Sequence, residues 1–345
     1  MSKNQLEGKR LLVVGAGGFI GGFICREGLA RGMKVTAAVR ESTSRRYLDD
    51  ARLEFLVLDY DDPSQMEKAI GDATAWDYVI YNLGATKAAT FPEFNLVNFE
   101  YLRRFVEILK KTDHVPAGFL FMSSLSAIGP GDEKNYTPLS ASTPPNPNTR
   151  YGLSKIKAEQ YLEFQSGIPY IIFRPTGVYG PHEKDYLMMI KSIDSHFDFG
   201  VGYRPQMLTF IYVDDLVEAM FNAIATPVTI KKKYIISEDR AYTQKEFRRI
   251  VADALGGKWV IPVRLPLWAV YAASVAAEKW GSLKGHASTL NRDKFRIMKQ
   301  RNWTCDISDA ARDFGFSPRV SLREGIEKTV EAYLEAKKAA EGPES

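Results

Sequence analysis

A glycine-rich run near the N-terminus constrains the fold more than any other feature of the chain. Residues 10–14 (RLLVV) predict a buried strand and residues 20–31 predict a helix, which begins inside the glycine run GAGGFIG that follows the strand. In such a unit the first glycine permits a tight turn, the second lets the backbone approach a pyrophosphate, and the third lets the helix pack on the strand. Free amides at the helix start then face the phosphates. The run predicts a dinucleotide site, with a purely structural turn as the alternative; its residues are Gly15, Gly17, Gly18, Phe19, Ile20 and Gly21.

Strand and helix patterns alternate through the first half of the chain. Short β-branched runs recur at 34–39, 54–58, 78–82, 118–122 and 169–173, with helical patterns between them. This alternation predicts an α/β fold built on a Rossmann-type, doubly wound parallel sheet. We expect residues 1–180 and 208–240 to form the dinucleotide-binding domain. Residues 181–207 and 241–345 are expected to form a smaller, mostly helical substrate lobe over the carboxyl ends of the strands.

Composition and patterning argue against several classes of protein. Lys and Arg number 46 against 42 Asp and Glu, a bias too small to predict nucleic-acid binding. The two cysteines and the four histidines (Cys25, Cys305, His114, His182, His196 and His286) are dispersed, so we expect neither a disulfide framework nor a metal site. The polar N-terminus lacks a signal-peptide core, which predicts a cytoplasmic protein.

One long apolar run stands out at residues 265–277. It is too short to span a bilayer, which takes about 20 residues. We expect a buried core helix here. The alternative is a lid that touches an apolar substrate or makes a peripheral membrane contact.

The end of the second predicted strand bears on the choice of cofactor. NAD sites commonly carry an acidic residue there to hold the ribose hydroxyls, whereas this strand ends Val39-Arg40. A guanidinium suits a 2′-phosphate, so we expect NADP(H) to be preferred over NAD(H), with a merely solvated Arg40 as the alternative. Residues 43–46 (TSRR) would assist. Asp59, which closes the third strand, is placed either to meet the adenine or to form a turn.

A tyrosine and a lysine suggest proton chemistry. Tyr151 and Lys155 share a face of a predicted helix, because residues i and i+4 are neighbours there. A lysine about 4 Å away, at an effective dielectric of about 20, is worth roughly 4 kcal/mol and would lower a tyrosine pKa by up to about three units. We expect Lys155 to bring the pKa of Tyr151 toward neutrality in this way. Ser124, in the serine-rich segment after strand 118–122, is expected to hold the substrate oxygen. The alternative is that these residues only pack.

Taken in order, these motifs resemble those of the extended short-chain dehydrogenase/reductases, also called the NAD-dependent epimerase/dehydratase family. The segments that carry the resemblance are GAGGFIG (15–21), LDYDD (58–62), NLGAT (82–86), Asn98, SSLSAIG (123–129), YGLSK (151–155), RPTGVYGP (174–181) and FIYVDDL (210–216). The resemblance implies that Ser124, Tyr151 and Lys155 are catalytic and that Asp59 lies near the adenine. It also implies a possible homodimer, and further cofactor contacts at Leu83, Gly84, Ala85, Ser123, Pro175, Thr176, Gly177 and Val178.

The substrate class follows less directly from the resemblance. Family members that act on nucleotide-diphosphate sugars typically carry an arginine just before the F-x-x-V-D-D run, where this chain reads PQMLTF at 205–210, with Arg204 as the nearest cation. Segments 266–278 and 305–326 resemble the 3β-hydroxysteroid dehydrogenase branch, which implies a sterol-like or oxo-lipid substrate. We therefore expect an NAD(P)(H)-dependent oxidoreductase that interconverts a secondary alcohol and a ketone. A nucleotide-sugar epimerase or dehydratase and a non-catalytic cofactor-binding scaffold are the alternatives.

Overall fold

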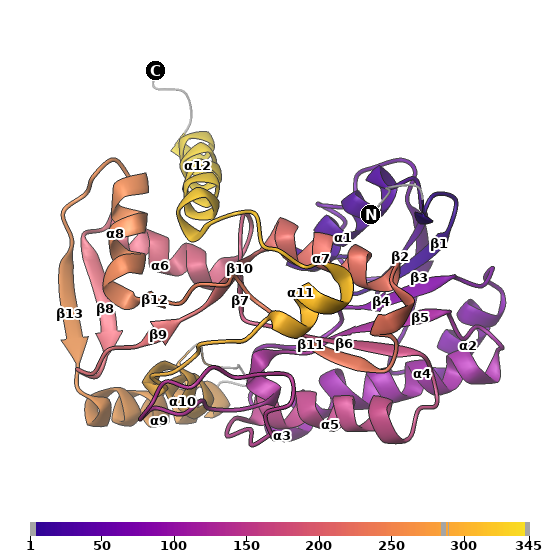
Figure 1. Ribbon diagram of the computed structural model, residues 1–345, viewed down its shortest axis with the longest axis horizontal. Coiled ribbons are helices and arrows are strands. Elements are labelled where there is room, and N and C mark those ends of the chain that lie inside the picture. The colour runs from indigo at the N-terminus through magenta and orange to yellow at the C-terminus, as the bar shows by residue number, and fades with distance from the viewer. Residues whose placement is uncertain (1–4, 284–287, 289, 342–345) are drawn as a thin grey trace.

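A seven-stranded parallel sheet forms the centre of the molecule (Figure 1). The computed structural model describes residues 5–283, 288 and 290–341. The strand order is β11-β6-β5-β4-β1-β2-β3. The chain reverses its direction of travel across the sheet between β1 and β4, which is where doubly wound sheets bind ligands. The strands are β1 Arg10–Val14, β2 Lys34–Val39, β3 Glu54–Val57, β4 Tyr78–Tyr81, β5 Gly118–Met122, β6 Tyr170–Pro175 and β11 Lys232–Ile236.

Helices cover both faces of this sheet. One face packs against α1 (Phe19–Ala30) and α7 (Val213–Ile224), and the other packs against α2 (Pro63–Gly71), α4 (Tyr101–Lys111) and α5 (Arg150–Phe164). Strands β1 and β5 are almost wholly buried, which explains why they read as continuous apolar runs. The fold predicted from the alternating pattern, an α/β Rossmann-type sheet, is confirmed.

A second group of elements lies beside the sheet (Figure 1). It contains α6 (Lys184–Asp194), β8 (Phe197–Val201), α8 (Gln244–Ala254), β13 (Ile261–Leu265), α9 (Leu267–Leu283) and α10 (Arg292–Lys299). Strands β8 and β13 pair in parallel. We did not expect β13 from the sequence, because a proline interrupts its short apolar run; a proline is tolerated in an edge strand such as this one.

The remaining elements connect the two groups. Two short pairs join β7 (Gly177–Tyr179) with β10 (Phe210–Tyr212), and β9 (Met207–Leu208) with β12 (Tyr242–Thr243). Helix α3 (Phe91–Asn95) runs through a π-helical turn, Leu96–Glu100, into α4. Near the C-terminus, α11 (Ser308–Phe314) returns to the sheet, where Phe314 stacks on Phe173 of β6. Helix α12 (Leu322–Glu341) packs against α8.

The apolar run 265–277 does not form the buried core helix that we expected. It forms most of α9, in which Leu267, Trp268 and Tyr271 leave 45%, 75% and 48% of their surfaces exposed. The expectation was wrong because, among the helix side chains that the structure describes, only a narrow stripe at Val270 and Ser274 is buried. Val270 packs with Phe295 of α10 and Val201 of β8. Among the described helices, none is both long and apolar enough to cross a membrane.

Candidate functional site

A cavity of about 1250 Å³ lies at the carboxyl ends of the central strands and extends between the sheet and the second group of elements. Most of the residues predicted to form the site line this cavity. They are Gly15, Gly17, Gly18, Phe19, Ile20, Arg40, Leu83, Gly84, Ser123, Ser124, Tyr151, Lys155, Pro175, Thr176, Gly177 and Val178. Three predicted residues are not part of its lining: Gly21, Asp59 and Ala85.

The glycine turn has the geometry of a phosphate cradle. Gly15 has a φ of +84°, and a side chain there would bring a Cβ atom to 2.8 Å from the backbone nitrogen of Leu83. Gly18 is the N-cap of α1 and has no side-chain cap, so the first amides of that helix are free to bind an anion. Gly21 lies behind the turn, where a Cβ atom would overlap the carbonyl oxygens of Gly15 and Ala16. The cradle is thus bare backbone.

Arg40 lies directly after β2 and borders the same end of the cavity. Its side chain is exposed, and the neighbouring Thr43 and Ser44 also line the cavity. The next two arginines are turned to other partners: Arg45 stacks over Phe55 at 4.4 Å and Arg46 over Tyr47 at 5.6 Å. Of these three arginines, Arg40 is therefore the one that lines the cavity.

A buried asparagine shapes the turn after β4. The side chain of Asn98, which is fully buried, accepts a hydrogen bond from the amide of Ala85 at 2.8 Å and donates one to its carbonyl at 3.0 Å. It also donates to Ser154 Oγ at 2.9 Å. Ala85 is thereby held behind the cavity wall, while Leu83 and Gly84 face the cavity. Asn98 thus connects this turn to the helix that carries Tyr151 and Lys155.

Asp59 lies in an exposed turn outside the cavity lining. Its carboxylate accepts a hydrogen bond from the amide of Asp61 at 2.9 Å, and its own amide donates to Gln65 Oε1 at 2.8 Å. These contacts fit the alternative of a turn residue. Its neighbour Tyr60, which is buried, borders the cavity instead.

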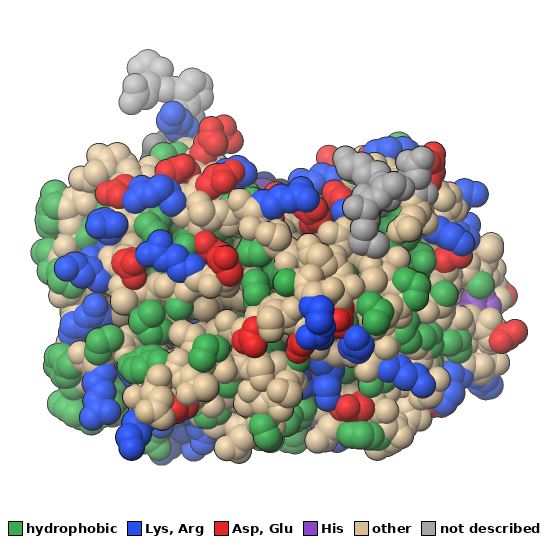
Figure 2. All heavy atoms as spheres, in the orientation of Figure 1, with side chains coloured by type: hydrophobic (Ala, Val, Ile, Leu, Met, Phe, Trp, Pro, Cys, Tyr) green, Lys and Arg blue, Asp and Glu red, His purple; other side chains and the backbone are tan. Residues whose placement is uncertain are grey.

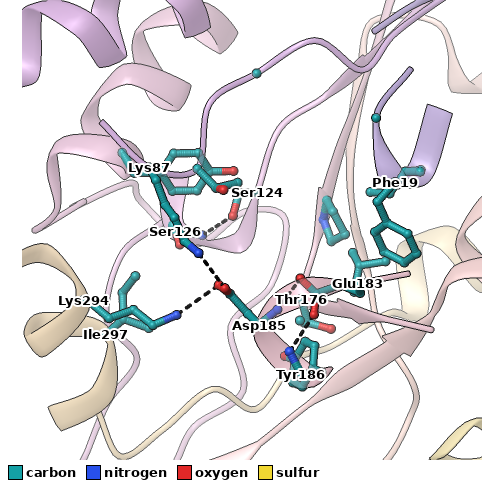
Figure 3. A pocket seen from close by; sticks show the side chains of 18 of the residues that line it. Phe19, Lys87, Ser124, Ser126, Thr176, Glu183, Asp185, Tyr186, Lys294 and Ile297 are labelled. Carbon is teal, nitrogen blue, oxygen red and sulfur yellow. Dashed lines mark hydrogen bonds and ion pairs between the residues drawn. The ribbon is translucent and has the colours of Figure 1, made fainter. Parts of the chain in front are cut away.

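Ser124 and Tyr151 meet in the wall of the cavity. Ser124 follows β5 and caps a short 3₁₀ helix, accepting a hydrogen bond from the amide of Ser126 at 3.2 Å (Figure 3). Tyr151 is the second residue of α5, whose N-cap is Thr149. Burial raises the pKa of Tyr151 to about 12, although a hydrogen bond with Ser124 opposes this increase. The phenol is therefore protonated at neutral pH, whereas the sequence led us to expect a lowered pKa.

Lys155 lies one helical turn after Tyr151 and is buried. Its ammonium donates to the backbone carbonyl of Met122 at 2.8 Å and lies 4.9 Å from the centre of the Phe121 ring. Burial lowers the pKa of Lys155 to about 8, and the negative charge of Glu159 opposes that decrease. The ammonium is directed at the end of β5, which explains why the expected lowering of the Tyr151 pKa is not found.

The sequence analysis did not single out Glu159 and Arg174, which form a buried ion pair next to the cavity wall. Each exposes 1% of its surface, and the guanidinium Nε of Arg174 donates to both carboxylate oxygens of Glu159 at 3.1 Å. Glu159 also accepts a hydrogen bond from Ser123. Glu159 could have been found from the spacing of four residues along α5, which puts it on the same helix face as Tyr151 and Lys155. The spacing gives no such signal for Arg174.

The opposite wall of the cavity is mainly apolar and comes from α6, β8 and α10. Its apolar side chains include Met188, Met189, Phe197, Phe199, Val201, Ile297 and Met298. A charged group interrupts this wall: Asp185 pairs with Lys87 at 2.7 Å and with Lys294 at 3.2 Å (Figure 3). These two lysines hold the pKa of Asp185 below its usual value, although burial opposes them. Sequence reasoning missed this wall because its residues lie far apart in the chain.

Metal ligands do not gather in the described part of the chain. No group of three His, Cys, Asp or Glu side chains there is close enough to hold an ion, and His286 lies outside the described residues.

The comparisons with known proteins agree with the Rossmann-type fold described above. The sequence profile described as "NAD dependent epimerase/dehydratase family" matches residues 11–237, which is most of the chain. The protein belongs to the NAD-dependent epimerase/dehydratase family. This confirms the resemblance on which the predicted site residues partly depended, and the named members of this family are enzymes.

Individual relatives are distant but similar over most of their length. The UDP-glucose 4-epimerase of Vibrio cholerae is 25% identical and aligned over 95% of this chain and 96% of its own. The 2-alkyl-3-oxoalkanoate reductase of Shewanella oneidensis is 24% identical, and the alignment covers 92% of this chain and 84% of that protein. The UDP-glucose 4-epimerase of Thermus thermophilus, solved in complex with NAD, has a TM-score of 0.75 at 20% identity. The superposition covers 95% of this chain and 99% of that one. The solved structure supports the fold alone, and the relatives leave the substrate open.

Proposed function

We propose that the protein is an NADP(H)-preferring oxidoreductase that interconverts a secondary alcohol and a ketone on an apolar or amphipathic substrate. The observation that carries this proposal is the composition of the cavity. One wall carries Ser124, Tyr151 and Lys155, and the wall of α6, β8 and α10 is mainly apolar. In this interpretation residues 1–180 and 208–240 bind the dinucleotide, and residues 181–207 and 241–345 bind the substrate.

The cofactor end of the cavity fits a dinucleotide. The bare backbone at Gly15 and Gly18 and the uncapped start of α1 would hold the pyrophosphate. Arg40 would bind the 2′-phosphate of NADP(H), because its fork of N–H donors matches phosphate oxygens. Glu41, which would suit ribose hydroxyls, is not in the cavity lining. When bound, the nicotinamide supplies or accepts the hydride.

Tyr151 would act as the proton donor. Its raised pKa keeps the phenol protonated, so it can give its proton to a carbonyl oxygen as that oxygen gains negative charge. Ser124 would donate a second hydrogen bond to the same oxygen, which stabilises the alkoxide-like transition state. A protonated phenol is the form that reduction requires, since in that direction the ketone gains a hydride and a proton and becomes an alcohol.

Lys155 would orient the reacting groups and supply positive charge beside them. With a pKa of about 8, the ammonium is mostly protonated at neutral pH. Its hydrogen bond to the Met122 carbonyl fixes it at the end of β5, next to the segment that carries Ser124. Glu159 favours the protonated form of Lys155 and is itself held by Arg174. The two are positioning residues.

The apolar wall supports a lipid-like substrate rather than a sugar nucleotide. Family members that act on nucleotide-diphosphate sugars typically carry an arginine just before the F-x-x-V-D-D run, and among the described lining residues Arg40, at the cofactor end, is the only arginine. Lys87 and Lys294 are both paired with Asp185. The Shewanella relative is named as a reductase of 2-alkyl-3-oxoalkanoates, and such a substrate combines a ketone with an apolar chain.

A nucleotide-sugar epimerase is the second candidate, because the Vibrio relative of that name is similar over nearly the whole chain. The two functions differ in cofactor balance: an epimerase returns the hydride to the same substrate, whereas a reductase consumes NADPH. We would incubate the protein and NADPH with 3-oxo acids, sterol ketones and UDP-sugars and follow the loss of reduced nicotinamide. Consumption with an apolar ketone supports the proposal. Interconversion of UDP-sugars without net consumption would replace it with the second candidate.

A further inference from the structure

The outward surface of α9 and the end of β13 carry large apolar side chains where a water-facing surface normally carries polar ones. We call this surface the α9 face and define it by Leu265, Leu267, Trp268 and Tyr271. Trp268 and Tyr271 expose 75% and 48% of their surfaces, and Leu265 exposes 38%. A patch of exposed apolar side chains on a protein surface usually marks a site that binds a partner, a ligand or a membrane.

Exposed basic side chains lie on and beside the α9 face. Lys279 of α9 and Lys299 of the neighbouring α10 are both exposed. The acidic Glu278 pairs with Arg150 at 2.6 Å and with Arg292 at 2.9 Å, so its charge is compensated. Two other basic residues of this segment are paired with acids elsewhere: Lys258 with Asp194 and Lys294 with Asp185. Figure 2 shows hydrophobic side chains next to Lys and Arg at the end of the molecule formed by β8 and β13.

We propose that the α9 face docks onto an anionic lipid bilayer. Tryptophan and tyrosine are favoured at the boundary between headgroups and acyl chains, because their rings are apolar and carry a polar group. Lys and Arg beside them are attracted to the negative surface of an anionic leaflet. An apolar helix face with basic neighbours is the pattern by which proteins lie on a membrane without crossing it. Exposed Lys279, on the same helix, adds to this attraction.

The α9 face is continuous with the substrate end of the cavity. Leu265 of β13 is paired with Val201 of β8, and Val201, Phe199 and Phe197 line the cavity. Phe197 and Phe199 are exposed as well. A protein docked through the α9 face would therefore hold the apolar wall of its cavity beside the bilayer. Delivery of a bilayer-dissolved ketone by this route rests on the proposed function, whereas the docking itself does not.

Co-sedimentation with vesicles tests the docking without any turnover. The full-length protein would be mixed with vesicles of phosphatidylcholine alone and with vesicles in which about a third of the lipid is phosphatidylglycerol. We expect at least about tenfold more bound protein on the anionic vesicles, with a shift of tryptophan emission to shorter wavelength. Trp268→Gln should reduce binding about tenfold, and Lys279→Glu should reduce it on the anionic vesicles.

A matched control separates this surface from exposed apolar residues in general. Phe164, at the end of α5, exposes 73% of its surface, and Phe164→Gln should bind vesicles like the unaltered protein. Unaltered secondary structure by circular dichroism would show that both variants are folded. Equal binding of Trp268→Gln, or no preference for anionic vesicles, would overturn the proposal. So would a dimer in size-exclusion chromatography with light scattering that Trp268→Gln dissociates, since a second copy would then cover the face. Each result holds whether or not the proposed reaction is found.

Discussion

Glu159 and Arg174 form an ion pair that is almost wholly buried beneath the cavity wall that carries Tyr151 and Lys155, each side chain exposing 1% of its surface. Glu159 lies one helical turn after Lys155, and its charge favours the protonated form of that lysine. The pair therefore connects the stability of the sheet with the protonation of a residue in the site. A buried pair of this kind is costly to break, because the remaining partner keeps an uncompensated charge.

We predict that Glu159→Gln lowers the free energy of unfolding by about 3–5 kcal/mol, because Arg174 loses its counter-charge in a buried position. Denaturant titration measures this. The control is Glu163→Gln on the same helix, which removes a partly exposed pair with Lys233 and should cost less than about 1 kcal/mol. Equal losses for the two variants would contradict the role given to burial.

Much of the fold could be predicted from the sequence because local pattern and burial agree there. The strand predicted at 34–39 is β2 as observed, and α1 begins inside the glycine run that follows β1, as expected. Helix α9 shows the limit of this reasoning. A run of apolar residues indicates a core helix when the chain folds over it, but the sequence does not reveal that, among the described side chains of α9, only Val270 and Ser274 would be buried.

The candidate site divides in the same way. Residues near one another in the sequence, such as Tyr151 and Lys155, could be placed on one helix face from spacing alone. The partner of a charged group could not, because it depends on the packing of distant segments. Lys155 donates to the carbonyl of Met122, and Asp185 pairs with Lys87 from the sheet side and Lys294 from α10. For this reason the predicted direction of the Tyr151 pKa shift was wrong, and burial raises that pKa.

Loss of the Tyr151 hydroxyl should remove turnover and leave cofactor binding intact. We expect Tyr151→Phe to lower kcat by about 10²–10⁴, the usual contribution of a general acid. Ser124→Ala should lower it by about 10²–10³, because one donor to the developing oxyanion is lost. Steady-state rates and the NADPH dissociation constant check both. A Tyr151→Phe variant with normal turnover would instead indicate another proton donor.

The protonation of Lys155 should set the alkaline limit of activity. Its pKa is about 8, so kcat/KM should be full below that pH and fall as the pH rises through it and the ammonium loses its charge. Lys155→Arg should remove this alkaline limb, since a guanidinium stays charged. Glu159→Gln should move the limb to lower pH, because the group that favours the charged form is gone. If the fall in kcat/KM occurred at the same pH in both variants, a group other than Lys155 would cause it.

Arg40 should decide between the two nicotinamide cofactors. We expect Arg40→Ser to raise the KM for NADPH about 10–100-fold, as when a hydrogen bond to a charged group is lost, and to leave the KM for NADH nearly unchanged. Arg45→Ser is the matched control, because Arg45 stacks over Phe55 and does not line the cavity. If Arg40→Ser affected both cofactors equally, Arg40 would not be reading the 2′-phosphate.

The transfer of label from deuterated NADPH tests the central claim most directly. We predict that, with an apolar ketone, one deuterium appears on the carbinol carbon of the product for each NADPH oxidised. This transfer should disappear in Tyr151→Phe. Conversion of a substrate with no oxidation of NADPH and no deuterium in the product would contradict the account.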